Sequence, residues 1–105
     1  MNTMRTNISL TKYARGHLVG ARFTAAQLRE EVEIVLAQGF EVAFDFSGVE
    51  ATQSFIDELV GVLILRYSPD ILSRLVFKSC SDDVQAIIEF VVTDRCDQYI
   101  KQHSH

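Results

Sequence analysis

Residues 41–67, EVAFDFSGVEATQSFIDELVGVLILRY, carry the pattern that decides the fold of this chain. An almost uninterrupted apolar run ends at Asp45 and is followed by the turn sequence Ser47-Gly48. Two hydroxyl residues come next, and a long apolar segment with helical character follows them. Strands covered on both faces have such continuous apolar sequences, and the carboxyl ends of strands in open α/β sheets are where ligands and partners bind. The stretch therefore predicts an α/β fold with a site at the end of this strand.

The composition restricts the class of protein. The chain has 105 residues, 48% apolar and 23% charged, so we expect one globular domain over 1–105. A net charge of −4 argues against nucleic acid as a partner, because nucleic acid is bound by a basic face. No apolar run approaches the ~20 residues of a membrane span, and the amino terminus lacks a signal-peptide pattern, so we expect no membrane contact. Cys80 and Cys96 form no CxxC motif, which suits a reducing cytoplasm and indicates no metal or other cofactor.

Strand-like and helix-like segments alternate along the chain. A period of two near Ile8 predicts a strand, and Thr24 with Gln27 has the form of a capping box that opens a helix. Gly39 ends that helix, and Ser81 caps the last one. The expected elements are a strand at 8–13, a helix at 24–38, a strand at 41–46, a helix from 52 or 54 to 67, a strand within 72–78 and a helix from 82, with a loop at 14–22 in which a short strand at 18–19 is an option.

This β-α-β-α-β-α order, with its short connections, predicts a mixed or partly parallel sheet with helices packed against it. The second helix is apolar nearly all round, which indicates either deep burial or a surface shared with a partner. On the first helix, Arg29 and Glu33 are assigned to the polar face, opposite Leu28 and Val32. We expect the folded core at about 5–100 and a frayed tail at 101–105.

Asp45 has two interpretations, both compatible with its place at the end of an apolar strand. It is either a structural carboxylate that accepts hydrogen bonds from Ser47 or from amides near Gly48, or a functional group of the site. An unpaired buried charge is excluded by its cost.

The hydroxyls of Thr52 and Ser54 are first of all candidates for capping the second helix. A phosphate on either would lie at a helix N-terminus, where the added charge is favoured. Asp57 and Glu58 in the same first turn complement the helix dipole but would repel a phosphate on Ser54. The candidate partner-binding or regulatory residues are Asp45, Ser47, Gly48, Thr52, Ser54, Phe55, Asp57 and Glu58.

The loop before the first helix is a second candidate site. Backbone amides near Gly16 and Gly20, with the side chains of Arg15 and Arg22, offer a place for an anion at the helix N-terminus. The alternative is a loop in which the glycines only satisfy backbone geometry.

Enzyme motifs are absent from the sequence. It contains no GxxxxGK[ST] phosphate loop, no GxGxxG after a strand and no GxSxG elbow. His17 is the only histidine inside the expected fold, and no acid is paired with it in the sequence. We therefore expect no catalytic residue.

At FDFSGVEATQSFIDELVGVLI the chain resembles STAS domains, the fold of bacterial anti-sigma factor antagonists and of transporter C-terminal domains. Residues 45–49 match the Asp-Leu-Ser strand end of those domains, whereas Gln53-Ser54-Phe55-Ile56 stands in place of their Asp-Ser-Ser-Gly. Phe55 occupies the position of the serine that kinases phosphorylate in the antagonists. The resemblance therefore does not carry that phosphorylation site over to this chain.

A closer resemblance is to the bacterial STAS-like domains of unknown function. They carry a glycine- and arginine-bearing loop, here at 20–23, an Asp-Phe-Ser-Gly-Val strand end at 45–49, and Ser-Phe-x-Asp-Glu at 54–58. The resemblance covers about 5–100. It implies a small regulatory interaction module, sometimes found with histidine-kinase-like ATPase domains.

We therefore expect a cytoplasmic, non-enzymatic STAS-like module. It would dock a protein partner, such as a kinase-like ATPase, through residues 47–57, with Phe55 as an apolar anchor. One alternative is a small-ligand or nucleotide sensor that uses the glycine- and arginine-bearing loop before the first helix. The other is a homodimer built on the apolar second helix.

Overall fold

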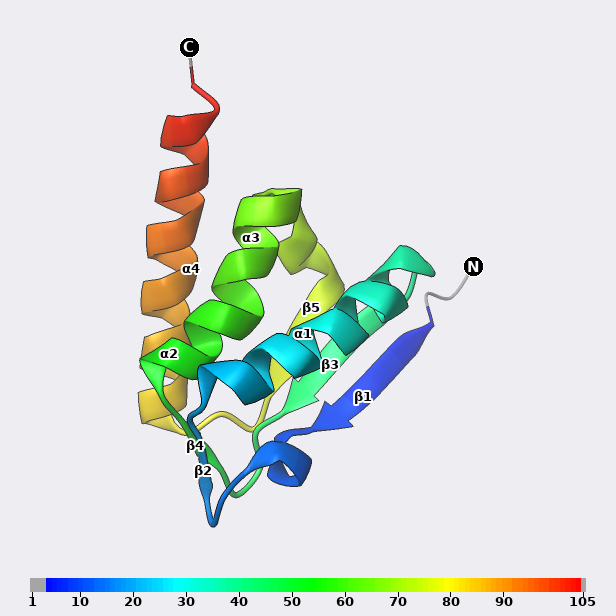
Figure 1. Cartoon of the computed structure of the whole chain (residues 1–105), viewed down its shortest axis with the longest axis vertical. Helices are drawn as coiled ribbons and strands as arrows, with labels where there is room; N and C mark the ends of the chain where they lie inside the picture. The colour runs from blue at the N-terminus through cyan, green and yellow to red at the C-terminus, as the bar shows by residue number, and fades with distance from the viewer. Residues whose placement is uncertain (1–3, 105) are drawn as a thin grey trace.

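Three parallel strands form the main sheet of the computed structural model, which describes residues 4–104. β1 (Arg5–Ser9), β3 (Glu41–Asp45) and β5 (Leu75–Lys78) lie in the order β1-β3-β5, and both neighbouring pairs are parallel. Figure 1 shows β3 between the two outer strands. The prediction of an α/β fold with a partly parallel sheet is confirmed, and the strand order is resolved.

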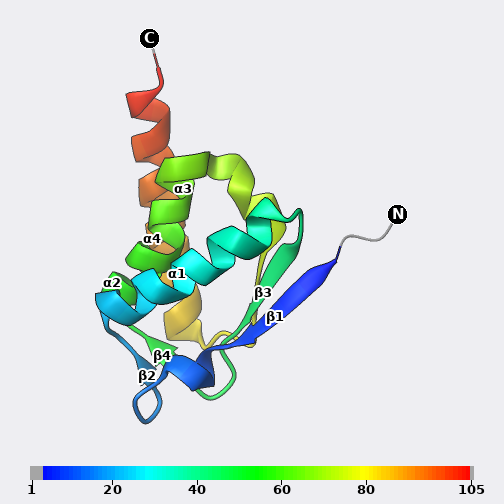
Figure 2. The same cartoon turned by 45° about the vertical axis from the view of Figure 1, so that its right-hand side comes forward.

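The central position of β3 explains its continuous apolar sequence. Val42, Ala43 and Phe44 are fully buried, and Phe44 stacks on Phe77 of β5 with ring centroids 5.7 Å apart. α1 (Arg22–Ala37) crosses in front of the sheet in Figure 2 and packs on β3. The strand is therefore covered as its sequence predicted.

The second predicted helix is one helical column made of three segments. α2 (Gln53–Ile56) leads into a π-helical turn, η2 (Asp57–Gly61), and α3 (Val62–Tyr67) completes the column. It packs against α1 on one side and α4 on the other (Figure 1). Deep burial is thus the reason for its apolar character, since six of its side chains are buried: Phe55, Ile56, Leu59, Val60, Leu63 and Ile64.

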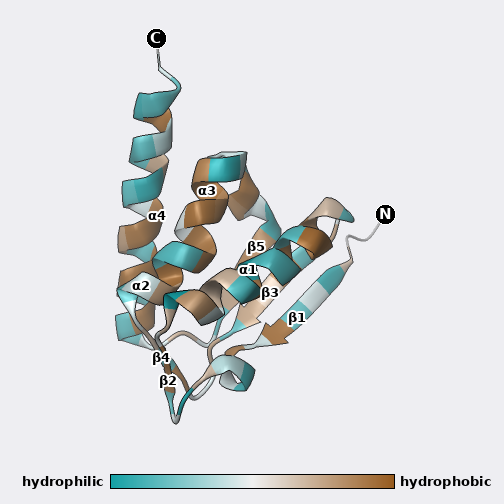
Figure 3. Cartoon of the chain, viewed as in Figure 1, coloured by the Kyte–Doolittle hydropathy of each residue, from teal (hydrophilic) through white to brown (hydrophobic). Residues whose placement is uncertain are grey.

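A 3₁₀ segment, η3 (Pro69–Arg74), connects the column to β5. α4 (Asp82–Gln102) then runs along one side of the molecule (Figure 1). Ser81 caps it, as predicted, by accepting a hydrogen bond from the N–H of Val84 at 3.1 Å. The ribbon in Figure 3, coloured by residue hydropathy, is mostly hydrophobic along α3 and hydrophilic over much of α4. None of the described helices combines the length and the apolar character that crossing a membrane requires.

A second, two-stranded sheet joins the loops that precede α1 and α2. β2 (Leu18–Val19) pairs in parallel with β4 (Glu50–Ala51). The pairing extends beyond the strands, because the N–H of Thr52 donates to the carbonyl of Val19 at 3.1 Å. The short strand at 18–19, left open as an option by the sequence, therefore fixes where both helices begin.

Two predicted boundaries are wrong. α1 begins at Arg22, two residues before Thr24, and no side chain caps it, so the capping-box pattern at Thr24 is not used. The first strand ends at Ser9, because a 3₁₀ turn, η1 (Leu10–Tyr13), places Leu10 in the core. Of the predicted tail at 101–105, Lys101 and Gln102 are the last residues of α4, and Lys101 Nζ lies 3.0 Å from the Asp97 carboxylate. Residues 1–3 and 105 lie outside the described part.

Candidate functional site

The turn after β3 is closed by Asp45. Its Oδ1 accepts hydrogen bonds from the Ser47 hydroxyl at 2.7 Å and from the backbone N–H of Ser47 at 2.9 Å. These two bonds, helped by the charge of Lys78, hold the pKa of the Asp45 carboxyl below its ordinary value. Gly48 has a φ of 73°, which glycine adopts without strain. Asp45 therefore has the structural role of the first interpretation, and Ser47 and Gly48 are exposed at the edge of the sheet.

Thr52 caps α2 and ties it to the loop before α1. Its hydroxyl oxygen accepts a hydrogen bond from the N–H of Phe55 at 3.1 Å and donates one to the carbonyl of Gly20 at 3.0 Å. A Cβ at Gly20 would lie only 3.2 Å from Cγ2 of Thr52. The Thr52 hydroxyl is thus hydrogen-bonded within the fold. A residue larger than glycine at position 20 would crowd Thr52 where the two loops meet.

The first turn of α2 presents some side chains and buries others. Gln53 and Ser54 are exposed, and among residues 4–104 the Ser54 hydroxyl makes no hydrogen bond. Phe55, in contrast, is fully buried in the core. The expectation that Phe55 anchors a partner is wrong, because a side chain packed at the centre of the core has no surface to offer.

Asp57 and Glu58 are held by arginines from two other helices. Asp57 accepts a hydrogen bond from Arg95 Nε of α4 at 2.6 Å and lies 3.4 Å from Arg22 Nη1 at the start of α1. Glu58 accepts from Nη1 of the buried Arg29 and lies 3.6 Å from Arg22. Burial alone would raise the pKa of the Asp57 carboxyl, but its bonds and charge interactions with Arg95 and Arg22 outweigh burial and lower it.

Gly61, the last residue of the π-helical turn, leaves room for the Asp57–Arg95 ion pair. Gly61 lies one turn after Asp57, and a Cβ at Gly61 would be 2.6 Å from Asp57 Oδ1 and 3.1 Å from Cγ of Arg95. Both approaches are too close for the neighbours to keep their places. The absent side chain of Gly61 therefore lets Asp57 and Arg95 meet against the helix.

The comparison with protein families follows the same stretch of the chain. A family model described as a STAS-like domain of unknown function (DUF4325) matches residues 24–85, from the first turn of α1 to the first turn of α4. The chain belongs to this family. No curated protein and no solved structure matches it.

The Ser-Phe-x-Asp-Glu segment of this STAS-like domain is the place where three helices are joined. Its phenylalanine fills the core, its two acids bind the arginines of α1 and α4, and only Ser54 faces outward. Most of the segment thus serves the fold, and only Ser54 is exposed to contact another molecule.

The four residues of the predicted anion loop do not act together. Arg15 is exposed at a tight turn, where its N–H donates to the carbonyl of Leu18 at 2.9 Å, and Gly16 supplies the positive φ of 62° that this turn needs. Arg22 faces the carboxylates of the second helix instead. The structure thus favours the alternative in which the glycines serve backbone geometry.

A polar cleft of about 370 Å³ opens between the start of α2 and α4. Ser54 and Asp57 line it from the helical column, and Phe90 and Asp94 line it from α4. Arg22 and Arg95 also border it, although each is paired with an acid. The cleft therefore places the exposed Ser54 beside the outer surface of α4.

Cys80, Cys96 and His17 are the other reactive side chains that the sequence points to. Within residues 4–104, no three His, Cys, Asp or Glu side chains gather in a way that would hold a metal ion. Burial raises the pKa of the Cys80 and Cys96 thiols, so neither thiolate is favoured. His17 Nδ1 lies 3.3 Å from the carbonyl of Gly48 and connects two loops.

Two residues of the ion-pair network, Arg29 and Arg95, were not among the candidates from the sequence. Arg29 was assigned to the polar face of α1 but is buried beside Leu28 and Val32. Its position four residues after Ala25 and three before Val32 is a signal of the buried face. Arg95 carried no signal, because its partner lies 38 residues away in the chain.

Proposed function

We propose that this STAS-like domain is a non-enzymatic regulatory module that docks a protein partner on the edge formed by residues 47–57. The observation that carries the proposal is the contrast within this edge. Ser47, Gly48, Gln53 and Ser54 are exposed, whereas Asp57 and Glu58 behind them are fixed by arginines. A fixed surface loses little conformational entropy on binding, which favours recognition of a partner.

The chemistry of the edge supports docking over catalysis. The depressed pKa of Asp45 makes this carboxylate a weak base, and its oxygen is already hydrogen-bonded to Ser47. Ser54 has no base within hydrogen-bond reach among the described residues, so nothing activates its hydroxyl.

The partner we propose is a signalling protein of the cytoplasm, such as a kinase-like ATPase. If that partner modifies the edge, Ser54 is the accessible hydroxyl, because Thr52 already donates and accepts within the fold. The two free cysteines suit a reducing compartment. The sensor alternative is weaker, since Arg22 is engaged by two carboxylates and the glycines beside it serve loop geometry.

Two exposed glutamines give a matched test. Gln53 lies on the edge, and Gln38 lies at the opposite end of α1, where the chain enters β3. We expect affinity capture from the native host, followed by mass spectrometry, to recover the partner with wild type and Gln38→Arg. Recovery with Gln53→Arg should fall about tenfold or more, because a long charged side chain clashes with a partner fitted to the edge.

The same experiment is able to reject the proposal. If all three proteins capture the same set of proteins equally, or if only the chain itself is recovered each time, the edge is not a docking site. Thermal unfolding of both variants serves as the control for folding, since surface substitutions of this kind change stability by about 0.5 kcal/mol or less.

A further inference from the structure

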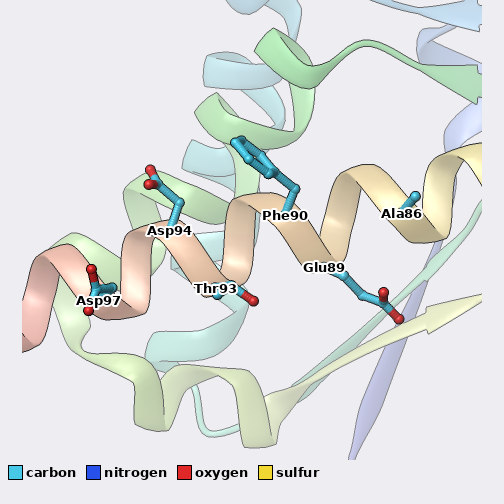
Figure 4. A pocket seen from close by; sticks show the side chains of 6 residues that line it. All are labelled: Ala86, Glu89, Phe90, Thr93, Asp94 and Asp97. Atoms are coloured by element: carbon cyan, nitrogen blue, oxygen red, sulfur yellow. The ribbon is translucent and has the colours of Figure 1, made fainter.

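The outer face of α4 carries a stripe of exposed side chains that the fold does not use. We call Ala86, Glu89, Phe90, Thr93, Asp94 and Asp97 the α4 stripe, and Figure 4 shows them along one side of the helix. Their spacing of three and four residues places them on one face. Phe90, in its middle, is 57% exposed and borders a shallow hollow of about 560 Å³. Phe23 at the start of α1 is 74% exposed, so exposure alone does not single out Phe90; its place in the lining of the cleft beside Ser54 does.

The charged residues of the stripe, Glu89, Asp94 and Asp97, are all acidic. α4 contains five acidic and two basic residues, so its formal charge is −3, against −4 for the whole chain. The basic pair, Arg95 and Lys101, is occupied: Arg95 binds Asp57, and Lys101 lies 3.0 Å from the Asp97 carboxylate. Asp97 is in turn paired with Lys101, so the stripe presents an aromatic ring beside the carboxylates of Glu89 and of Asp94, which lies 4.0 Å from Arg95 Nη1.

The stripe is continuous with the docking edge. Phe90 and Asp94 belong both to the stripe and to the lining of the cleft beside Ser54. A partner that contacts Ser54 thus has an unbroken path along the cleft onto α4.

We propose that the α4 stripe receives a basic amphipathic helix of the partner, with Phe90 as the apolar anchor. The stripe spans 12 residues of helix, from Ala86 to Asp97, which is about 17 Å at 1.5 Å per residue. A partner helix of about three turns covers it, placing apolar residues on Phe90 and Ala86 and lysines or arginines against Glu89, Asp94 and Asp97. The inference rests on the proposed function for the identity of the partner, whereas the binding itself is testable alone.

Charge decides between a partner and a second copy of this chain. In a twofold dimer through the stripe, Glu89, Asp94 and Asp97 would face the same acids of the other copy. Like charges placed opposite one another are unfavourable, whereas a basic helix neutralises them. The occupant is therefore a different, basic segment.

The test uses the full chain and a defined probe. The probe is an 18-residue helical peptide with leucines at i, i+4, i+7 and i+11 and with lysine or arginine at the flanking positions. A peptide of the same composition in scrambled order controls for net charge. Chemical-shift changes in ¹H–¹⁵N NMR spectra at physiological salt locate the binding site and give the Kd.

We expect shifts along 86–97 and at Ser54, and a Kd that Phe90→Ala raises at least about tenfold, as for truncation of a hot-spot aromatic. Ile34 of α1, 62% exposed, gives the matched variant Ile34→Ala, for which the Kd should change by less than about twofold. Equal binding of the scrambled peptide, an unchanged Kd for Phe90→Ala, or shifts elsewhere would overturn the inference.

Failure of this inference is distinguishable from failure of the proposed function. If Gln53→Arg abolishes capture of the partner while the peptide does not bind the stripe, docking on the edge is supported and binding of a helix to α4 is rejected. If the peptide binds the stripe through Phe90 while Gln53→Arg captures the same proteins as wild type, binding of a helix to α4 is supported and docking on the edge is rejected.

Discussion

Asp57 and Glu58, at the start of the second helix, have side chains that are 15% and 23% exposed, whereas Asp94 and Asp97 of α4 are 59% and 63% exposed. The first pair is in contact with three arginines from two other helices. The second pair meets only Arg95 at 4.0 Å and Lys101 on its own helix. Two sets of acids about 40 positions apart in one small domain thus have opposite environments.

The difference indicates which charges serve folding and which are free to bind. Partly buried ion pairs cost a great deal when one member is removed, because the other charge remains without a partner. Exposed acids contribute little to stability and keep their charge available for a partner. If this division is correct, substitutions should separate the two regions by their effect on the free energy of unfolding.

The largest effect is expected for Glu58→Ala. This change leaves the buried guanidinium of Arg29 with only Glu33, 3.7 Å away, and the backbone carbonyl of residue 58. Loss of one member of a buried pair destabilises a protein by about 3 kcal/mol. The measurement is the urea midpoint, and Glu89→Ala in the α4 stripe is the matched control, expected within about 0.5 kcal/mol. Equal losses for the two variants would remove the distinction between the two regions.

A smaller effect is expected for Gly61→Ala, which tests whether Asp57 and Arg95 need the space beside the helix. The added Cβ would approach Asp57 Oδ1 to 2.6 Å, so one of the two ion-pair members has to move. Crowding of this kind costs about 2 kcal/mol, partly offset by the gain of about 1 kcal/mol in helix propensity.

A double-mutant cycle isolates the contact behind the Gly61 prediction. With Asp57→Ala present, the clash with the carboxylate is gone, and Gly61→Ala should change from destabilising to neutral or stabilising. If Gly61→Ala costs the same in both backgrounds, the close approach of Asp57 is not what keeps this position a glycine.

The order of strands and helices could be predicted from the sequence, because it depends on local periodicity and caps. The apolar run before Asp45, the hydroxyl at Thr52 and the hydroxyl at Ser81 each act within a few residues of their place in the chain. The family could be inferred as well, because the resemblance rests on a contiguous motif at 54–58, which lies within the stretch that the family model matches.

What the sequence did not reveal depends on contacts between distant residues. Thr24 with Gln27 has the sequence of a capping box, but α1 begins earlier, at Arg22, and so places Arg22 against the acids of the second helix. Arg29 looks like a surface residue until Glu58, 29 positions later, is brought beside it. Phe55 lies inside the segment predicted to dock a partner, yet it belongs to the core together with Ile56 and Leu59. Ion pairs across helices have no local signature.

The smallest effect concerns acid stability and Asp57. Its folded-state pKa is lowered from the ordinary value of 3.8, so as the pH falls the unfolded chain takes up the proton first. The stabilisation from Asp57 is complete above its unfolded pKa and is lost as the pH falls through the folded one, that is, from about pH 5 downward. Asp57→Asn keeps a hydrogen-bond acceptor for Arg95 but no charge, so it should cost about 1 kcal/mol at neutral pH and less in acid. Urea unfolding at a series of pH values measures both quantities. The two stability curves should therefore converge toward low pH; curves that stay parallel would mean that the Asp57–Arg95 pair owes its effect to hydrogen bonding alone and not to charge.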